Sequence, residues 1–96
     1  MQPAVERLAQ IGPLPSSSAA TAPELRELEV LLGEVQTPIT DDEAKALVRL
    51  FGPDDCLGIA WSLLHLIETS PGWPIEGALH GLNGEWIDRL KERGAH

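Results

Sequence analysis

The sequence predicts an all-α fold, a compact bundle of four to five short helices around one central apolar helix. Two segments begin with a threonine that is followed three residues later by a glutamate, which is the spacing of a helix capping box. Apolar residues recur at helical spacing, and no segment shows the alternating β-branched pattern of strands. A chain of 96 residues can bury one core, so we expect residues 1–96 to form a single small domain.

The N-terminal part of the chain predicts a helix and a linker. Residues 3–11 place three apolar side chains on one side of a helix that Gly12 would end, namely Val5, Leu8 and Ile11. Residues 12–22 read GPLPSSSAATA, and two prolines with three consecutive serines indicate a linker. We therefore expect the helix at 1–11 to be loosely attached, or to pack on a neighbouring molecule in a homo-oligomer formed through residues 1–22.

The next two helices carry clear start signals. Thr21 and Glu24 have the spacing of a capping box at the start of the first of them. Thr40 and Glu43 repeat that spacing at the start of the second, which the Gly-Pro pair at 52–53 would end. The apolar stripes that would face the core are Leu25, Leu28, Leu31, Leu32 and Val35 in the first helix, and Leu47, Val48, Leu50 and Phe51 in the second.

The most apolar stretch, residues 58–74, contains most of the predicted central helix, which runs from about 55 to 69. At helical spacing its apolar side chains cover an arc of roughly 220°. This arc contains Leu57, Ile59, Ala60, Trp61, Leu63, Leu64 and Ile67, and only Gly58, Ser62, His65 and Thr69 form a polar strip. Gly58 and Ser62 are small residues four positions apart, which would let another helix pass close by. We expect neighbouring helices to cover this helix on most sides.

The C-terminal part of the chain combines turns with a last helix. Trp73 lies between Pro71 and Pro74, and a tryptophan held in this way can anchor a binding partner or fold back as a lid over the core. Asn83 is the expected N-cap of the last helix, which ends in basic residues. The residues of this helix that would face the core are Trp86, Ile87 and Leu90.

His65 and Glu68 raise the question of a catalytic or metal site. They lie about 60° apart on one helix and can touch, so they could transfer a proton, bind a metal, or form a structural pair at the edge of the core. A metal site needs three or four ligands, and neither His80 nor Cys56 stands at a recognised spacing from this pair. We therefore expect a structural pair, no catalytic, metal or cofactor site, and a Cys56 that acts as a small buried hydrophobe.

The charge pattern points to a protein partner. The chain carries 15 acidic and 7 basic residues, a net charge of −8, and residues 50–88 contain no lysine or arginine. Such a field repels nucleic acid and attracts a basic protein surface. The acidic pairs at two expected helix N-termini are the natural contacts for such a surface. The partner-binding residues predicted on this basis are Asp41, Asp42, Asp54, Asp55 and Trp73.

These observations favour a non-catalytic acidic protein-interaction module. In composition the chain resembles small acidic helical proteins that neutralise bacterial toxins, which implies an immunity or inhibitor role against a basic partner. The alternatives are a small enzyme or ligand-binding protein with a site around His65, Glu68 and His80, or a helical adaptor subunit of a larger assembly. The single cysteine and the lack of a signal-peptide or membrane-spanning pattern lead us to expect a cytoplasmic protein with no membrane contact.

Overall fold

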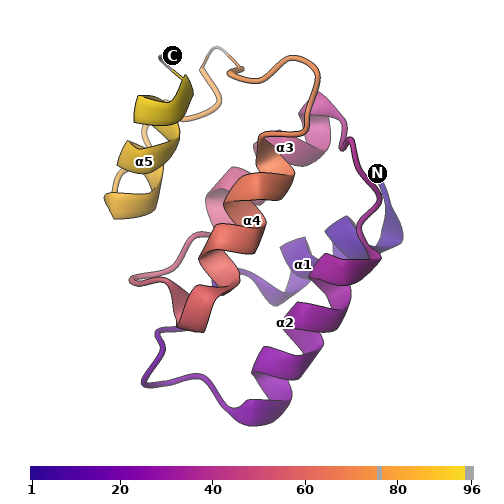
Figure 1. The fold of residues 1–96 in the computed structure, drawn as a ribbon, viewed down its shortest axis with the longest axis vertical. Coiled ribbons are helices and arrows are strands. Elements are labelled where there is room, and N and C mark those ends of the chain that lie inside the picture. Colours follow the sequence, from indigo (N-terminus) through magenta and orange to yellow (C-terminus); the bar gives the residue numbers. More distant parts are fainter. Residues whose placement is uncertain (76, 95–96) are drawn as a thin grey trace.

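The computed structural model describes residues 1–75 and 77–94, and within them the chain is helical without any strand. The predicted all-α class is therefore confirmed. Figure 1 shows α1 (Pro3–Ile11), α2 (Ala22–Glu34), α3 (Asp41–Leu47), α4 (Ile59–Ile67) and α5 (Glu85–Gly94). Two single turns of 3₁₀ helix, η1 (Val48–Leu50) and η2 (Cys56–Gly58), follow α3 and precede α4.

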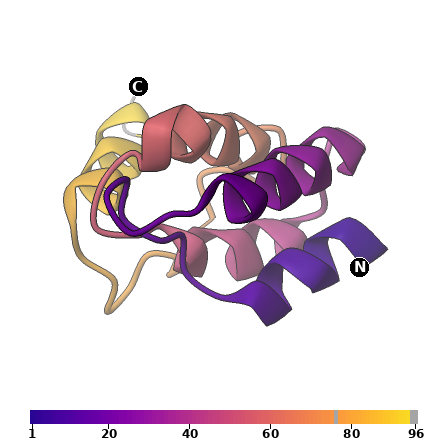
Figure 2. The ribbon, with the colours of Figure 1, turned by 90° about the horizontal axis from the view of Figure 1, so that it is seen from below.

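The helices form two layers with α5 at one side. Figure 2 shows α2 and α4 in one layer and α1 and α3 in the other. Each of these four helices contacts one neighbour in its own layer and one in the other layer, since α1 packs on α2 and α3, and α4 packs on the same two helices. The core lies between the layers, and α5 covers the side of α4 that faces away from α2 (Figure 1).

Both predicted capping boxes are present. The backbone N–H of Glu24 donates to Thr21 Oγ1 at 3.3 Å, and the backbone N–H of Thr21 donates to the Glu24 carboxylate at 3.4 Å. The corresponding distances for Thr40 and Glu43 are 3.1 and 2.9 Å. The core-facing residues of the two helices that follow are Leu28, Leu32, Val35, Ala44 and Leu47.

The N-terminal residues are tied to the rest of the fold. Val5 and Leu8 are buried where α1 meets α2 and α3. Leu14, in the segment predicted as a linker, is also buried, and its backbone N–H donates to the Leu50 carbonyl oxygen at 2.8 Å. The chain passes so close here that a Cβ on Gly52 would collide with the Leu14 carbonyl. Association of this chain with another copy through residues 1–22 stays a prediction.

The central helix is shorter than the predicted 55–69. It begins at Ile59 because Cys56 and Leu57 have φ values of 47° and 55°, outside the right-handed helical region. Cys56 therefore lies in η2 rather than in the first turn of α4. The helix ends at Ile67, and beyond it the Thr69 hydroxyl donates to the Leu66 carbonyl oxygen at 2.7 Å. Such local side-chain hydrogen bonds compete with helix continuation.

The predicted apolar arc of this helix is only partly buried. Ile59, Ala60, Leu63, Leu64 and Ile67 are buried as expected. Leu57 and Trp61 were expected in the core, but their exposed fractions are 64% and 38%. Leu57 turns outward because its backbone is left-handed. Trp61 leaves the core because it packs edge-on against Trp86, with ring centroids 4.9 Å apart, at the surface between α4 and α5.

α5 is attached through three buried side chains, those of Trp86, Ile87 and Leu90. Trp86 stacks on Phe51 at a centroid distance of 5.9 Å, and the Arg89 guanidinium lies over the rings of Trp61 and Trp86 at 5.2 and 5.1 Å. The helix begins at Glu85, so Gly84 rather than the predicted Asn83 immediately precedes it. The N–H of Asp88 donates to the Gly84 carbonyl oxygen at 3.0 Å, which sets this starting point.

Candidate functional site

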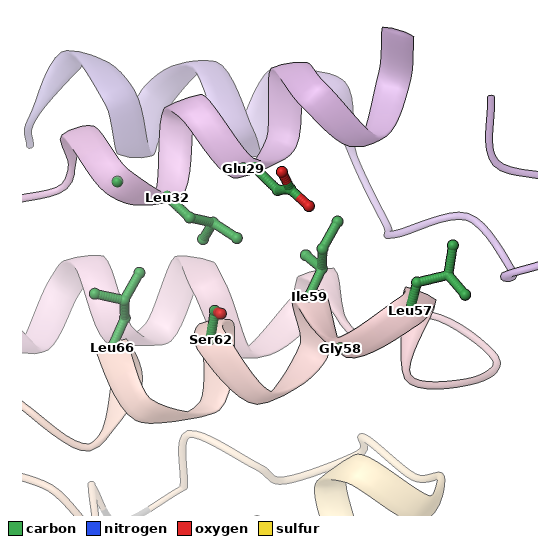
Figure 3. A pocket seen from close by; sticks show the side chains of 8 residues that line it. Glu29, Leu32, Leu57, Gly58, Ile59, Ser62 and Leu66 are labelled. Carbon is green, nitrogen blue, oxygen red and sulfur yellow. The ribbon is translucent and has the colours of Figure 1, made fainter. Parts of the chain in front are cut away.

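A groove with a volume of about 480 Å³ lies between α2 and α4. Figure 3 shows the side chains of the two helices facing one another across it. The residues that line the groove are Glu29, Leu32 and Gly33 from α2, and Leu57, Gly58, Ile59, Ser62 and Leu66 from the η2–α4 segment. Leucine and isoleucine side chains alternate there with glycines, the Ser62 hydroxyl and the Glu29 carboxylate, so the groove offers both apolar and polar contacts to a ligand.

Small residues keep this groove open. A Cβ on Gly33 or Gly58 would meet no atom within 4 Å, and Ser62 is exposed beside them. The spacing of Gly58 and Ser62 predicted that a helix could pass close to α4, and α2 does lie there. The side chains on the two helices are nevertheless too small to fill the space between them. The unfilled space is the groove.

Leu57 stands at one end of the groove, beside the start of α4 (Figure 3). Its exposed fraction of 64% is high for a leucine, and its φ of 55° is left-handed. A left-handed conformation costs a residue other than glycine roughly 1–2 kcal/mol. The fold therefore holds an exposed apolar side chain in a strained conformation, a combination that is typical of binding sites.

A cluster of hydrogen bonds, which we call the Ser17–Asp54 clasp, holds Leu57 in place. The Asp54 carboxylate accepts from the backbone N–H groups of Ser17, at 3.0 Å, and Cys56, at 2.9 Å. The backbone N–H of Leu57 donates to Ser17 Oγ at 3.2 Å and to Asp55 Oδ1 at 3.3 Å. The N–H groups of Ser17 and Cys56 hold the pKa of Asp54 below its usual value. The clasp thus uses charged acceptors, which make strong hydrogen bonds.

The electrostatic character of the groove is acidic. The ion pairs among the described residues join Arg7 to Glu27, Arg89 to Glu85 and Arg93 to Glu68. Glu29 takes part in none of these and is exposed at the groove wall. Arg26 stands three positions before Glu29 on α2 and lines a second surface pocket with Val30 and Leu31, and none of the ion pairs named above joins it to Glu29. None of the residues described as lining the groove is a lysine or arginine, and Glu29 is the charged residue among them.

The four acidic residues predicted to bind a partner have different structural roles. Asp54 and Asp55 belong to the clasp. Asp41 accepts a hydrogen bond from the backbone N–H of Gly72 at 2.9 Å and so ties the start of α3 to the turn after α4. Asp42 is exposed. Sequence reasoning did not identify Glu29 or Leu57 as site residues. Asp54 and Asp55, shortly before Gly58, are a sequence signal for a local turn, and this signal could have placed Leu57 outside the helix.

Trp73 packs against the core and is half-buried in the segment between α4 and α5. Its backbone N–H donates to the Ser70 carbonyl oxygen at 3.1 Å. This placement matches the lid that the sequence allowed. A role for Trp73 in partner binding stays a prediction.

Among the described residues, Glu68 forms an ion pair with Arg93 and not the predicted pair with His65. The Glu68 carboxylate accepts two hydrogen bonds from Arg93, at 2.7 and 2.8 Å. The helix ends at Ile67, so Glu68 turns toward α5, where Arg93 reaches it. His65 is exposed, and its ring centroid lies 6.3 Å from that of Trp61.

The other candidates for chemistry are Cys56 and His80. Cys56 is buried, as predicted, and burial together with the nearby carboxylates of Asp54 and Asp55 raises the pKa of its thiol. His80 is exposed in the turn before α5. The part of the chain that the structure describes holds no group of three histidine, cysteine or acidic residues arranged to bind a metal.

No helix within residues 1–75 and 77–94 is both long and apolar enough to span a bilayer. Comparison with protein-family models, curated proteins and solved structures finds no match. The function is therefore inferred from the side chains of this chain alone.

Proposed function

We propose that this chain is a non-catalytic, acidic protein-interaction module that binds a protein partner with a basic surface. The observation that carries this proposal is the groove between α2 and α4, where Leu57 is held exposed on a strained turn and Glu29 stands at the wall without forming any of the ion pairs among the described residues. Apolar side chains in the groove supply binding energy, and a carboxylate at its wall selects for a basic group.

The net charge supports the same kind of partner. A protein of net charge −8 attracts a basic surface over distances of several ångströms and raises the rate of encounter. Such a module would act as an inhibitor or immunity protein if the basic surface that it covers is the working surface of the partner. A cytoplasmic location is part of the proposal, since the single cysteine allows no internal disulfide and fits a reducing compartment.

The experiment begins by isolating the partner through cross-linking in cells that express the protein. The association rate of the purified pair is then measured between about 0.01 and 0.15 M salt, where the screening length falls from about 30 to 8 Å. We expect the rate to fall steeply as salt rises.

Two charge reversals refine this measurement. Asp42→Lys and Glu6→Lys change the net charge equally at exposed positions on α3 and α1. Both should lower the association rate through the overall field, and a folding check by circular dichroism accompanies each. An association rate that neither salt nor these charges alters would reject the proposed function.

A further inference from the structure

The shape of the groove constrains what can occupy it. Its walls are two helices that run side by side, and its lining residues follow helical spacing on each, at 29, 32 and 33 and at 59, 62 and 66. The lining residues span 59–66 on α4, about 10 Å along the helix axis, and 29–33 on α2, about 6 Å. A groove of this length contacts about two turns of a helical segment.

The backbone chemistry of the walls decides between a helical and an extended segment. Both walls are α-helices, whose backbone N–H and C=O groups are bonded within each helix, so the groove presents no sheet edge to pair with an extended strand. An extended peptide would find no strand to pair with there and would have to bond its backbone groups to water. A helix satisfies its backbone internally and can lay an apolar face in the groove.

The charge of the groove residues indicates whether a basic or an acidic occupant is favoured. Glu29 lies at the wall without a basic partner among the described residues, and the carboxylates of Asp54 and Asp55 lie beside the end marked by Leu57. A second copy of this chain would bring a net charge of −8 toward these groups. A basic segment of a different protein is the occupant that this charge favours.

We infer that the α2–α4 groove binds a basic amphipathic helix of the partner, with apolar residues against Leu57 and Leu66 and a lysine or arginine against Glu29. This inference rests on the proposed function and specifies its binding mode. The Ser17–Asp54 clasp is then a positioning element, because it fixes Leu57 before the partner arrives and so lowers the entropy lost on binding.

The test uses a synthetic peptide of about 14 residues, roughly 21 Å long as a helix. It carries leucines at helical spacing on one face and lysines beside them. A matched peptide has glutamate in place of every lysine, and a third has a central proline that breaks the helix. Binding is measured by fluorescence anisotropy to the whole protein and to the variants Glu29→Lys, Leu57→Ser and Glu6→Lys, each checked for folding by thermal unfolding.

The expected pattern is specific to the groove. The lysine peptide should bind the unmodified protein about tenfold more tightly than the glutamate peptide, and Glu29→Lys should reverse this order. Leu57→Ser should weaken the lysine peptide about tenfold. Glu6→Lys, on a helix that does not line the groove, should preserve the preference, and the proline peptide should bind weakly. Backbone amide signals of the protein should shift along residues 29–33 and 57–66.

Three results would overturn the inference. The first is a preference for the lysine peptide that Glu29→Lys leaves unchanged, or amide shifts centred on Asp41 and Asp42. The second is equal binding of the proline peptide, which would indicate an extended occupant. The third is a homodimer in sedimentation experiments that Leu57→Ser dissociates. If any of these occurs while the isolated partner still associates in a salt-dependent way, the interaction module stands and only the groove is rejected.

Discussion

At the residue scale, the backbone conformation at position 57 disfavours a leucine, whereas the proposed binding role requires its apolar side chain. A leucine with a φ of 55° and an exposed fraction of 64% gains little from burial and bears the cost of a left-handed backbone. Asparagine adopts this conformation more readily. Such a position is retained when the side chain is needed for binding, because stability and function are then opposed.

The substitution Leu57→Asn should therefore raise the free energy of unfolding by about 0.5–1 kcal/mol, because it relieves the left-handed strain and exposes little new apolar surface. Urea denaturation measures this gain. The same variant should lose affinity for the lysine peptide. A loss of stability in Leu57→Asn would show that the leucine side chain contributes to the fold and would remove the conflict.

A second residue-scale prediction concerns His65. Glu68 takes its hydrogen bonds from Arg93, so His65→Ala should change the free energy of unfolding by less than about 0.5 kcal/mol. Arg93→Ala should have only a small effect, because both side chains are partly exposed and solvent screens the pair. Urea midpoints at low and high salt compare the two. A larger effect from His65→Ala would indicate that His65 and Glu68 pair in solution.

At the element scale, the joint between α1 and α3 depends on a buried carboxylate. Glu43 is 2% exposed and accepts hydrogen bonds from the backbone N–H groups of Gln2, at 2.8 Å, and Thr40, at 2.9 Å. Burial alone would raise the pKa of Glu43, but the hydrogen bonds from Gln2 and Thr40 outweigh it and hold the pKa below 4.5. One side chain thus caps α3 and fastens the N-terminus of α1.

The sign of this pKa shift gives a prediction for acid stability. A carboxyl group whose pKa is lowered by folding stabilises the protein fully above its unfolded pKa, about 4.3 for a glutamate, and loses that contribution as pH falls through the folded pKa. The free energy of unfolding should therefore decline below about pH 4.5. Glu43→Gln should cost about 1–2 kcal/mol at neutral pH and should show a shallower acid decline.

A matched control for this experiment is Glu34→Gln, at an exposed position near the end of α2. It should leave the acid decline almost unchanged. Chemical denaturation between pH 3 and pH 7 follows both variants, a range chosen to bracket ordinary carboxyl pKa values of about 4. An acid decline in Glu43→Gln as steep as in the unmodified protein would mean that other carboxyl groups are responsible.

At the scale of the whole molecule, α4 connects α2 and α3 to α5. It packs on α2 and α3, and α5 covers a further side through Trp61 and Trp86. Leu63, at the middle of α4, is 1% exposed, so its side chain faces only the core. Leu63→Ala should therefore lower the free energy of unfolding by about 2–5 kcal/mol, measured by urea denaturation.

The exposed residue Ser62, next to Leu63 in the sequence, provides the control for this substitution. Ser62 lines the groove, and Ser62→Ala should change stability by less than about 0.5 kcal/mol. A cost below about 1 kcal/mol for Leu63→Ala would mean that α4 is not central to the core, and the molecule would then depend on other contacts for its stability.

The amino-acid sequence by itself determined the helical class, both capping boxes and the buried stripe from Ile59 to Ile67. These features depend on interactions between residues three or four positions apart, which a helix satisfies locally. Cys56 was predicted to be buried from its place on the apolar arc of the central helix, and it is buried although it lies in η2 outside α4.

Only the tertiary structure decided where α4 begins, which residue pairs with Glu68, and that α2 and α4 leave a groove between them. Each of these depends on groups that are distant in the sequence. Ser17 meets Asp54 and so stabilises a left-handed turn, and Arg93 reaches Glu68 from the last helix. Helical spacing says which side of a helix is apolar, but the neighbours that pack against it decide which side chains are covered and which stay exposed.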